Sequence, residues 1–73
     1  MGEFKLKTEV AGRICALPVE VGASVKKGDD VAVVEAMKME IPVTCPVDGK
    51  VRAILVAVDD TVAEGQPLIV LDA

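Results

Sequence analysis

Apolar and polar residues alternate along much of the chain with the period of two that β-strands require. Phe4, Leu6 and Thr8, for example, alternate with charged residues. Turns rich in Gly, Asp and Pro separate the apolar segments, and no window of useful length has the period of a helix. The pattern predicts strands at about 3–8, 12–18, 31–36, 39–43, 49–56 and 67–72, with short extended pieces around Val25 and Val62.

The chain contains an internal repeat, which emerges when the sequence is compared with itself at an offset of 37 residues. The comparison needs no gap, and it defines two halves, 2–36 and 39–73, joined by Met37-Lys38. The identical pairs include Gly12 with Gly49, Val25 with Val62, and Gly28 with Gly65. Because each half is too short to bury its own apolar face, we expect the two halves to complete one core.

One difference between the halves concerns a turn, where Gly22 is matched by Asp59. Glycine adopts a left-handed backbone freely and aspartate tolerates it, so this turn is predicted to be left-handed in both halves. The alternative is that the two turns simply differ. Pro42 lies inside a predicted strand and lacks an N–H group, which favours an edge position for that strand.

The repeat predicts an all-β fold, a flattened β-barrel or sandwich of two halves related by a pseudo-twofold axis, in one domain over residues 1–73. Met37-Lys38 would form a two-residue hairpin turn, for which both residues need positive φ. The same symmetry places Gly2 beside Ala73, at a site opposite the hairpin. Lys38 is then exposed and far from the point where the chain attaches to anything else.

The composition of the chain argues against several classes of function. Hydrophobic residues make up 52% of the 73 residues, but Phe4 is the only aromatic residue, and the net charge is −4. An acidic chain without stacking platforms or a basic face is not expected to bind nucleic acid or an anionic membrane. A chain this short buries little of its surface, so an enzyme that encloses its substrate is not expected either.

The remaining reactive groups predict no metal or catalytic site. The chain has no His, and the pairs Asp29-Asp30 and Asp59-Asp60 lie in turns without the spacing of a calcium loop. Cys15 and Cys45 do not form a CxxC pair, and the sequence has neither a signal peptide nor an apolar run of membrane length. We therefore expect a cytoplasmic protein whose thiols are free and serve in packing.

The joint between the halves carries the most specific signal, the run Glu35-Ala36-Met37-Lys38-Met39-Glu40. It resembles the attachment motif of biotinyl domains, the biotin carboxyl carrier modules of biotin-dependent carboxylases and decarboxylases. The resemblance covers the whole chain, including the turn from Gly22 to Asp29. A departure from some members of that family is that no insertion, or "thumb", separates Ile14 from Val21.

The resemblance implies that Lys38 is biotinylated by a biotin protein ligase, through biotinyl-adenylate. A lysine on an exposed turn is almost fully protonated at neutral pH, so an activated donor is needed. The biotin would then shuttle carboxyl between a biotin carboxylase and a carboxyltransferase, and the chain itself would be a non-catalytic carrier. Ligase recognition is assigned on this basis to Glu35, Ala36, Met37, Met39 and Glu40.

These residues could have purely structural roles, and the chain could have another function. The methionines could fill gaps in the packing, and the glutamates could be solvated cross-strand charges. A lipoyl carrier, with lipoate on Lys38, has the same fold and repeat, although methionines on both sides of the lysine favour biotin. A third alternative is a small β interaction module without any prosthetic group.

Overall fold

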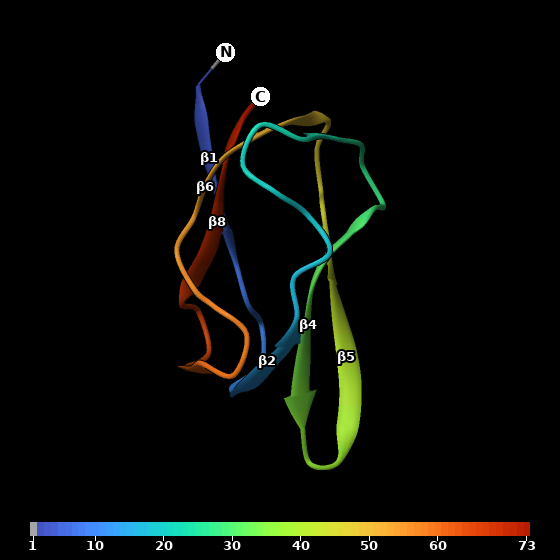
Figure 1. The fold of residues 1–73 in the computed structure, drawn as a ribbon, viewed down its shortest axis with the longest axis vertical. Helices are drawn as coiled ribbons and strands as arrows, with labels where there is room; N and C mark the ends of the chain where they lie inside the picture. The colour runs from blue at the N-terminus through green and yellow to red at the C-terminus, as the bar shows by residue number, and fades with distance from the viewer. Residues whose placement is uncertain (1) are drawn as a thin grey trace.

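The computed structural model describes residues 2–73, which form eight β-strands (Figure 1). The strands are β1 (Glu3–Lys7), β2 (Gly12–Ala16), β3 (Ser24–Val25), β4 (Asp30–Ala36), β5 (Met39–Thr44), β6 (Gly49–Ile54), β7 (Thr61–Val62) and β8 (Pro67–Asp72). The described residues contain no helix that could cross a membrane. Every helix or strand of the described residues is a β-strand, so the all-β prediction is confirmed.

Two of the predicted strands end two residues early. The strand expected at 12–18 ends at Ala16, and the one expected at 49–56 ends at Ile54. In both cases the pairing with the neighbouring strand shifts register shortly before the end, between Ile14 and Ala16 in β2 and between Val51 and Ala53 in β6. Such bulges bend a strand and increase its twist, so the chain leaves the sheet sooner than the apolar pattern suggests.

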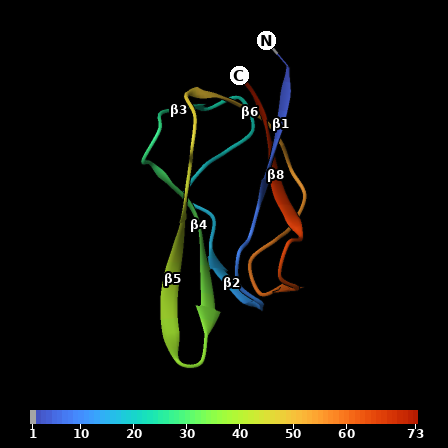
Figure 2. The ribbon, with the colours of Figure 1, turned by 180° about the vertical axis from the view of Figure 1, so that it is seen from behind.

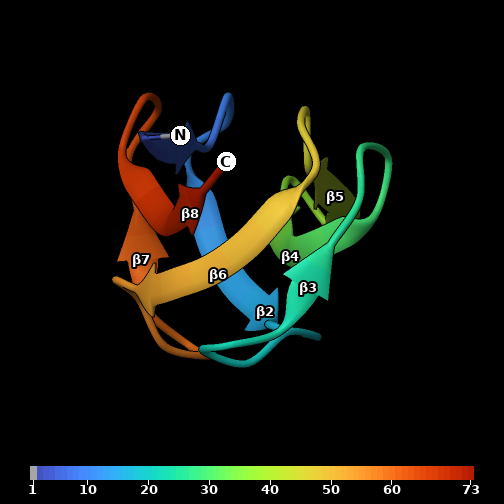
Figure 3. The same ribbon diagram turned by 90° about the horizontal axis from the view of Figure 1, so that it is seen from above.

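The strands form two four-stranded antiparallel sheets, in the orders β1-β8-β6-β3 and β5-β4-β2-β7. Each strand of one sheet is matched, at the repeat offset of 37 residues, by the strand at the same place in the other sheet. The predicted pseudo-twofold symmetry is therefore confirmed. Each sheet contains strands from both halves of the chain. Neither half can therefore complete a sheet alone, and the view from above shows the two sheets enclosing one interior (Figure 3).

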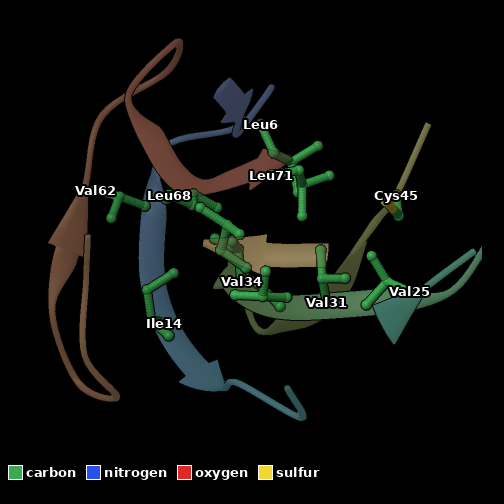
Figure 4. Close-up of a cluster of buried hydrophobic side chains, with 12 residues drawn as sticks. Leu6, Ile14, Val25, Val31, Val34, Cys45, Val62, Leu68 and Leu71 are labelled. Carbon is green, nitrogen blue, oxygen red and sulfur yellow. The ribbon is translucent and has the colours of Figure 1, made fainter. Parts of the chain in front are cut away.

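The core lies between the two sheets and consists mainly of aliphatic side chains (Figure 4). Its fully buried members come from both sheets and include Ile14, Val31, Val34, Leu68 and Leu71. Short branched side chains fill this narrow interior, which explains why the chain needs no large aromatic residue there. Its only aromatic residue, Phe4, is 36% exposed.

Two buried polar side chains occupy equivalent places in the halves. The Thr8 hydroxyl donates to the Val10 carbonyl at 2.7 Å, and the Cys45 thiol donates to the Val47 carbonyl at 2.8 Å. Each closes the turn that follows an edge strand, and each is almost fully buried. Cys15 and Cys45 are both free, as predicted, and Cys45 is a packing residue.

The molecule is elongated, measuring 36 × 17 × 17 Å. Both termini lie at one end, and the hairpin between β4 and β5 forms the other, as the front and back views show (Figures 1 and 2). Gly2 and Ala73 are hydrogen-bonded to each other, as the symmetry predicts. Pro42 lies in β5, an edge strand of its sheet, as its missing N–H group predicts.

Candidate functional site

The candidate site is the turn between β4 and β5. Ala36 and Met39 form the last register pair of the two strands, and Met37 and Lys38 connect them. Their φ angles are 52° and 65°, so both residues are left-handed, as a primed two-residue turn requires. This confirms the predicted geometry. A non-glycine residue rarely adopts such a conformation, and two in succession are tolerated mainly at functional turns.

The side chains of the turn are open to solvent. Met37 is 94% exposed and Met39 64% exposed, and Lys38 is exposed between them. Large apolar groups on a tip that contacts nothing else gain no packing energy from the fold. The interpretation of Met37 as a gap-filling core residue is therefore wrong, whereas an exposed apolar surface of this kind is typical of recognition by another protein.

The two glutamates of the motif face each other across the hairpin. Glu35 and Glu40 form a register pair one step below the turn. Glu35 is half-buried and accepts a hydrogen bond from Arg13 at 2.8 Å, whereas Glu40 is exposed. Like charges directly opposite each other repel, so the cation beside Glu35 offsets the repulsion. Glu35 is thus more than the freely solvated charge that the alternative describes.

The structure adds two residues that sequence reasoning did not assign to the site, Arg13 and Asp59. Arg13 lies in β2, opposite Glu35 in β4, and its guanidinium donates to the carboxylates of both Glu35 and Asp59. The pKa of Arg13 is raised, primarily by the hydrogen bond from its guanidinium to Glu35. The departure from the repeat at Asp59 was the available signal, but the sequence does not show what its carboxylate contacts.

The glycines near the site support the hairpin by allowing close approach. A Cβ atom at Gly12 would overlap the carbonyl oxygen of Glu35 and lie 2.8 Å from Val34 Cγ1. Only glycine therefore lets β2 lie this close to β4, the strand that carries the motif. No group of three or more His, Cys, Asp or Glu side chains suited to a metal ion occurs in residues 2–73.

Chemically, the site offers one primary amine on a rigid, exposed turn. An amine so placed can form an amide with an activated acyl group. These features fit covalent attachment of a prosthetic group by a separate enzyme.

Comparison with known proteins places the chain in a family. The profile of the family described as "Biotin-requiring enzyme" matches residues 5–71, nearly the whole chain. The chain therefore belongs to the biotin/lipoyl attachment family, whose members carry covalent biotin or lipoate on a lysine. More particularly, it matches the biotinyl carrier domains of biotin-dependent carboxylases, which confirms the predicted class of carrier domain.

Three proteins illustrate the similarity. Pyruvate carboxylase of Aspergillus niger is 43% identical over 60 residues, which are 82% of this chain and 5% of that protein. The biotin/lipoyl attachment protein of Bacillus subtilis (strain 168) is 36% identical over 63 residues, which are 86% of each chain. The crystal structure of Kluyveromyces lactis urea carboxylase contains a region with a TM-score of 0.92 and 35% identity, covering 99% of this chain and 6% of that one.

The lengths of these proteins differ greatly. This chain spans about a twentieth of the large carboxylases that it matches, but most of the small Bacillus subtilis protein. The similarity to the large proteins is thus similarity to one region of each. The family profile covers the same stretch, residues 5–71, so the region that matches is a carrier domain.

Proposed function

We propose that Lys38 is the acceptor for biotin, and that the chain carries carboxyl between a biotin carboxylase and a carboxyltransferase. The observation that carries this proposal is the geometry of the Met37-Lys38 turn. It presents a single lysine, flanked by exposed methionines, at the end of the molecule opposite both termini. The names of the large relatives, pyruvate carboxylase and urea carboxylase, support carboxyl transfer as the purpose.

In the attachment step, a biotin protein ligase supplies biotinyl-adenylate. The Lys38 amine loses its proton and attacks the activated carbonyl carbon, an amide bond forms at Nζ, and AMP leaves. The protein's part is to keep the amine exposed and the turn rigid, since both backbone and strand pairing fix the tip. When bound, biotin supplies the group that holds carboxyl, and the carrier supplies its position.

Attachment at one end of an elongated molecule also suits a shuttle. The termini at the opposite end leave the tip unobstructed whether the chain is free or tethered to a larger assembly. A tethered arm raises the effective concentration of its cargo at each partner site, provided that its length spans them. The cytoplasmic location expected from the sequence is part of this proposal.

The test is labelling of the purified chain by a biotin protein ligase with biotin and ATP, followed by intact mass measurement. The unaltered chain should gain the mass of one biotin less one water. K38R should gain nothing, because arginine stays protonated and cannot attack the activated carbonyl. K50R is the matched control, because Lys50 is an exposed strand lysine of the second half, and it should be labelled like the unaltered chain.

Lipoate is the second candidate cargo, because the family includes both cofactors. The same chain should be offered to a lipoate ligase with lipoate and ATP. Labelling by the biotin ligase alone supports biotin, and labelling by the lipoate ligase alone would replace biotin with lipoate. A chain that gains mass in neither reaction would refute the carrier proposal.

A further inference from the structure

The outer face of one sheet carries a row of charges that leads to the hairpin. Arg13 in β2 lies opposite Glu35 in β4, and Glu35 lies opposite Glu40 in β5. Because register partners point to the same face of a sheet, the three side chains share the solvent-facing side. The row therefore contains one cation and two carboxylates, directly below the turn that holds Lys38.

Arg13 is held from both sides. Its Nη2 atom donates to Glu35 at 2.8 Å, while Nη1 donates to the Asp59 carboxylate. Asp59 lies in the turn before β7, and its backbone N–H donates to the Ile14 carbonyl at 2.7 Å, next to Arg13. The guanidinium is a planar fork, so an anchor on one nitrogen fixes the direction of the other.

The repeat shows that this arrangement is specific to the hairpin end. At the opposite end, the positions of Arg13, Glu35 and Asp59 are held by Lys50, Asp72 and Gly22. The backbone is the same there: Lys50 pairs with Asp72 in register, and the Gly22 N–H donates to the Val51 carbonyl at 2.7 Å. A guanidinium is present at that end too, but it comes from another position: Arg52 Nη1 contacts Glu3 at 3.0 Å and Asp72 at 3.4 Å. Among the described residues, an arginine anchored by a turn aspartate is therefore found only beside Lys38.

The backbone conformation of Asp59 shows what its side chain contributes beyond the turn itself. Its φ angle of 79° is left-handed, and the equivalent Gly22 has 93°. Glycine adopts this left-handed conformation without strain, so the backbone alone does not require an aspartate at this position. What aspartate adds is the contact of its carboxylate with Arg13.

We propose that Arg13, anchored by Asp59, is a positioning residue for modification of Lys38. It holds the Glu35 carboxylate toward β2 and away from Glu40, so that the ligase meets two carboxylates at a defined separation below the lysine. This inference rests on the proposed function, because it assigns a role in the attachment step. Glu35 and Glu40 are then the contacts for cationic groups of the ligase, and Arg13 and Asp59 contact neither the lysine nor the activated acyl group.

The experiment measures the kinetic constants of the ligase reaction with the unaltered chain, R13M and D59G as protein substrates. R13M keeps the aliphatic stem and removes the donors, while D59G installs the residue that the other half has at this place. Both variants should raise KM for the protein about 3- to 10-fold, as expected for losing exposed charge-assisted contacts, and should leave kcat unchanged. Thermal unfolding of each variant checks that the fold is intact.

Further variants separate the effect of positioning from the effect of charge alone. R13K keeps the charge but lacks the fork, so its KM should lie closer to that of R13M than to that of the unaltered chain. K50M removes a cation at the equivalent place beside the termini and should leave KM unchanged. In an E35Q background, R13M should have no further effect, because the carboxylate that Arg13 positions is gone.

Specific outcomes would overturn the inference. If R13M and D59G are labelled with the unaltered KM, or if R13K restores it fully, Arg13 does not act by positioning. A lower KM in R13M would mean that Arg13 masks Glu35 instead. If the unaltered chain is labelled efficiently and these variants are labelled equally well, the proposed function stands and only the inference about Arg13 fails. If the unaltered chain is not labelled, both the proposed function and the inference fail.

Discussion

Gly2 and Ala73 exchange two backbone hydrogen bonds, with the Gly2 N–H donating to Ala73 at 3.2 Å and the Ala73 N–H donating to Gly2 at 3.0 Å. The repeat places this pair in the position that Met39 and Ala36 hold at the hairpin. The ends of the chain are therefore arranged as the two strands of a hairpin whose turn is missing. The pseudo-symmetry provides one completed turn, which carries Lys38, and one open end.

This arrangement predicts that the chain tolerates cyclisation. Joining Ala73 to Gly2 through an Asn-Gly turn should give a folded ring, since that dipeptide favours the primed turn that such a pair requires. Closing the chain removes conformational freedom from the unfolded state, so the free energy of unfolding should rise by about 1–4 kcal/mol. Denaturant unfolding of the ring and of the same chain with the junction cut provides the comparison. A ring less stable than the cut chain would contradict the geometry of the termini.

Close packing at Gly12 predicts a severe effect of a single methyl group. A Cβ there would overlap the Glu35 carbonyl oxygen, which belongs to the backbone and cannot move aside without separating β2 from β4. G12A should therefore destabilise the fold by about 3 kcal/mol or more, as overpacking against backbone does. Gly2 has nothing within 4 Å of its Cβ position, so G2A is the control. Equal thermal stability of the two variants would be inconsistent with this close approach.

The hydrogen bonds of the buried Thr8 hydroxyl are predicted to stabilise the fold. Thr8 donates to the Val10 carbonyl and accepts from the Val10 N–H, and it is 1% exposed. T8V keeps the shape but leaves both backbone groups without that partner, so the free energy of unfolding should fall by about 1–3 kcal/mol. T8S, which retains the hydroxyl and loses one methyl group, should lose about 1 kcal/mol. Chemical denaturation measures both, and a T8V variant as stable as the native chain would show that the contact contributes nothing.

Much of this fold could be predicted from the sequence because every feature of one half of the repeat has to be consistent with the other half. The offset that matches Gly12 with Gly49 also fixes the hairpin, the neighbouring termini and the left-handed turn at Asp59. The early ends of β2 and β6 could not be predicted, because a bulge depends on pairing between strands and the apolar pattern continues past it. Within the candidate site, the motif alone predicts Lys38 as the acceptor, because it is the lysine between the two methionines. The contact from Arg13 to Glu35 joins residues 22 positions apart and depends on the register of β2 and β4.

The left-handed turn at the tip predicts opposite effects on stability and on modification. Met37 has a φ of 52° and is 94% exposed, so its side chain strains the backbone and gains no burial in return. M37N should raise the free energy of unfolding by about 0.5 kcal/mol, because asparagine tolerates this conformation better than methionine does.

The same substitution should weaken labelling by the biotin protein ligase, since it removes an exposed apolar group next to Lys38. Thermal unfolding and initial labelling rates, measured on the same preparation, test the two effects together. M39N is the matched control, because Met39 is an exposed methionine within a strand and its replacement relieves no positive φ, so it should bring no gain in stability. If M37N were both less stable and fully labelled, neither the strain at the tip nor its role in recognition would hold.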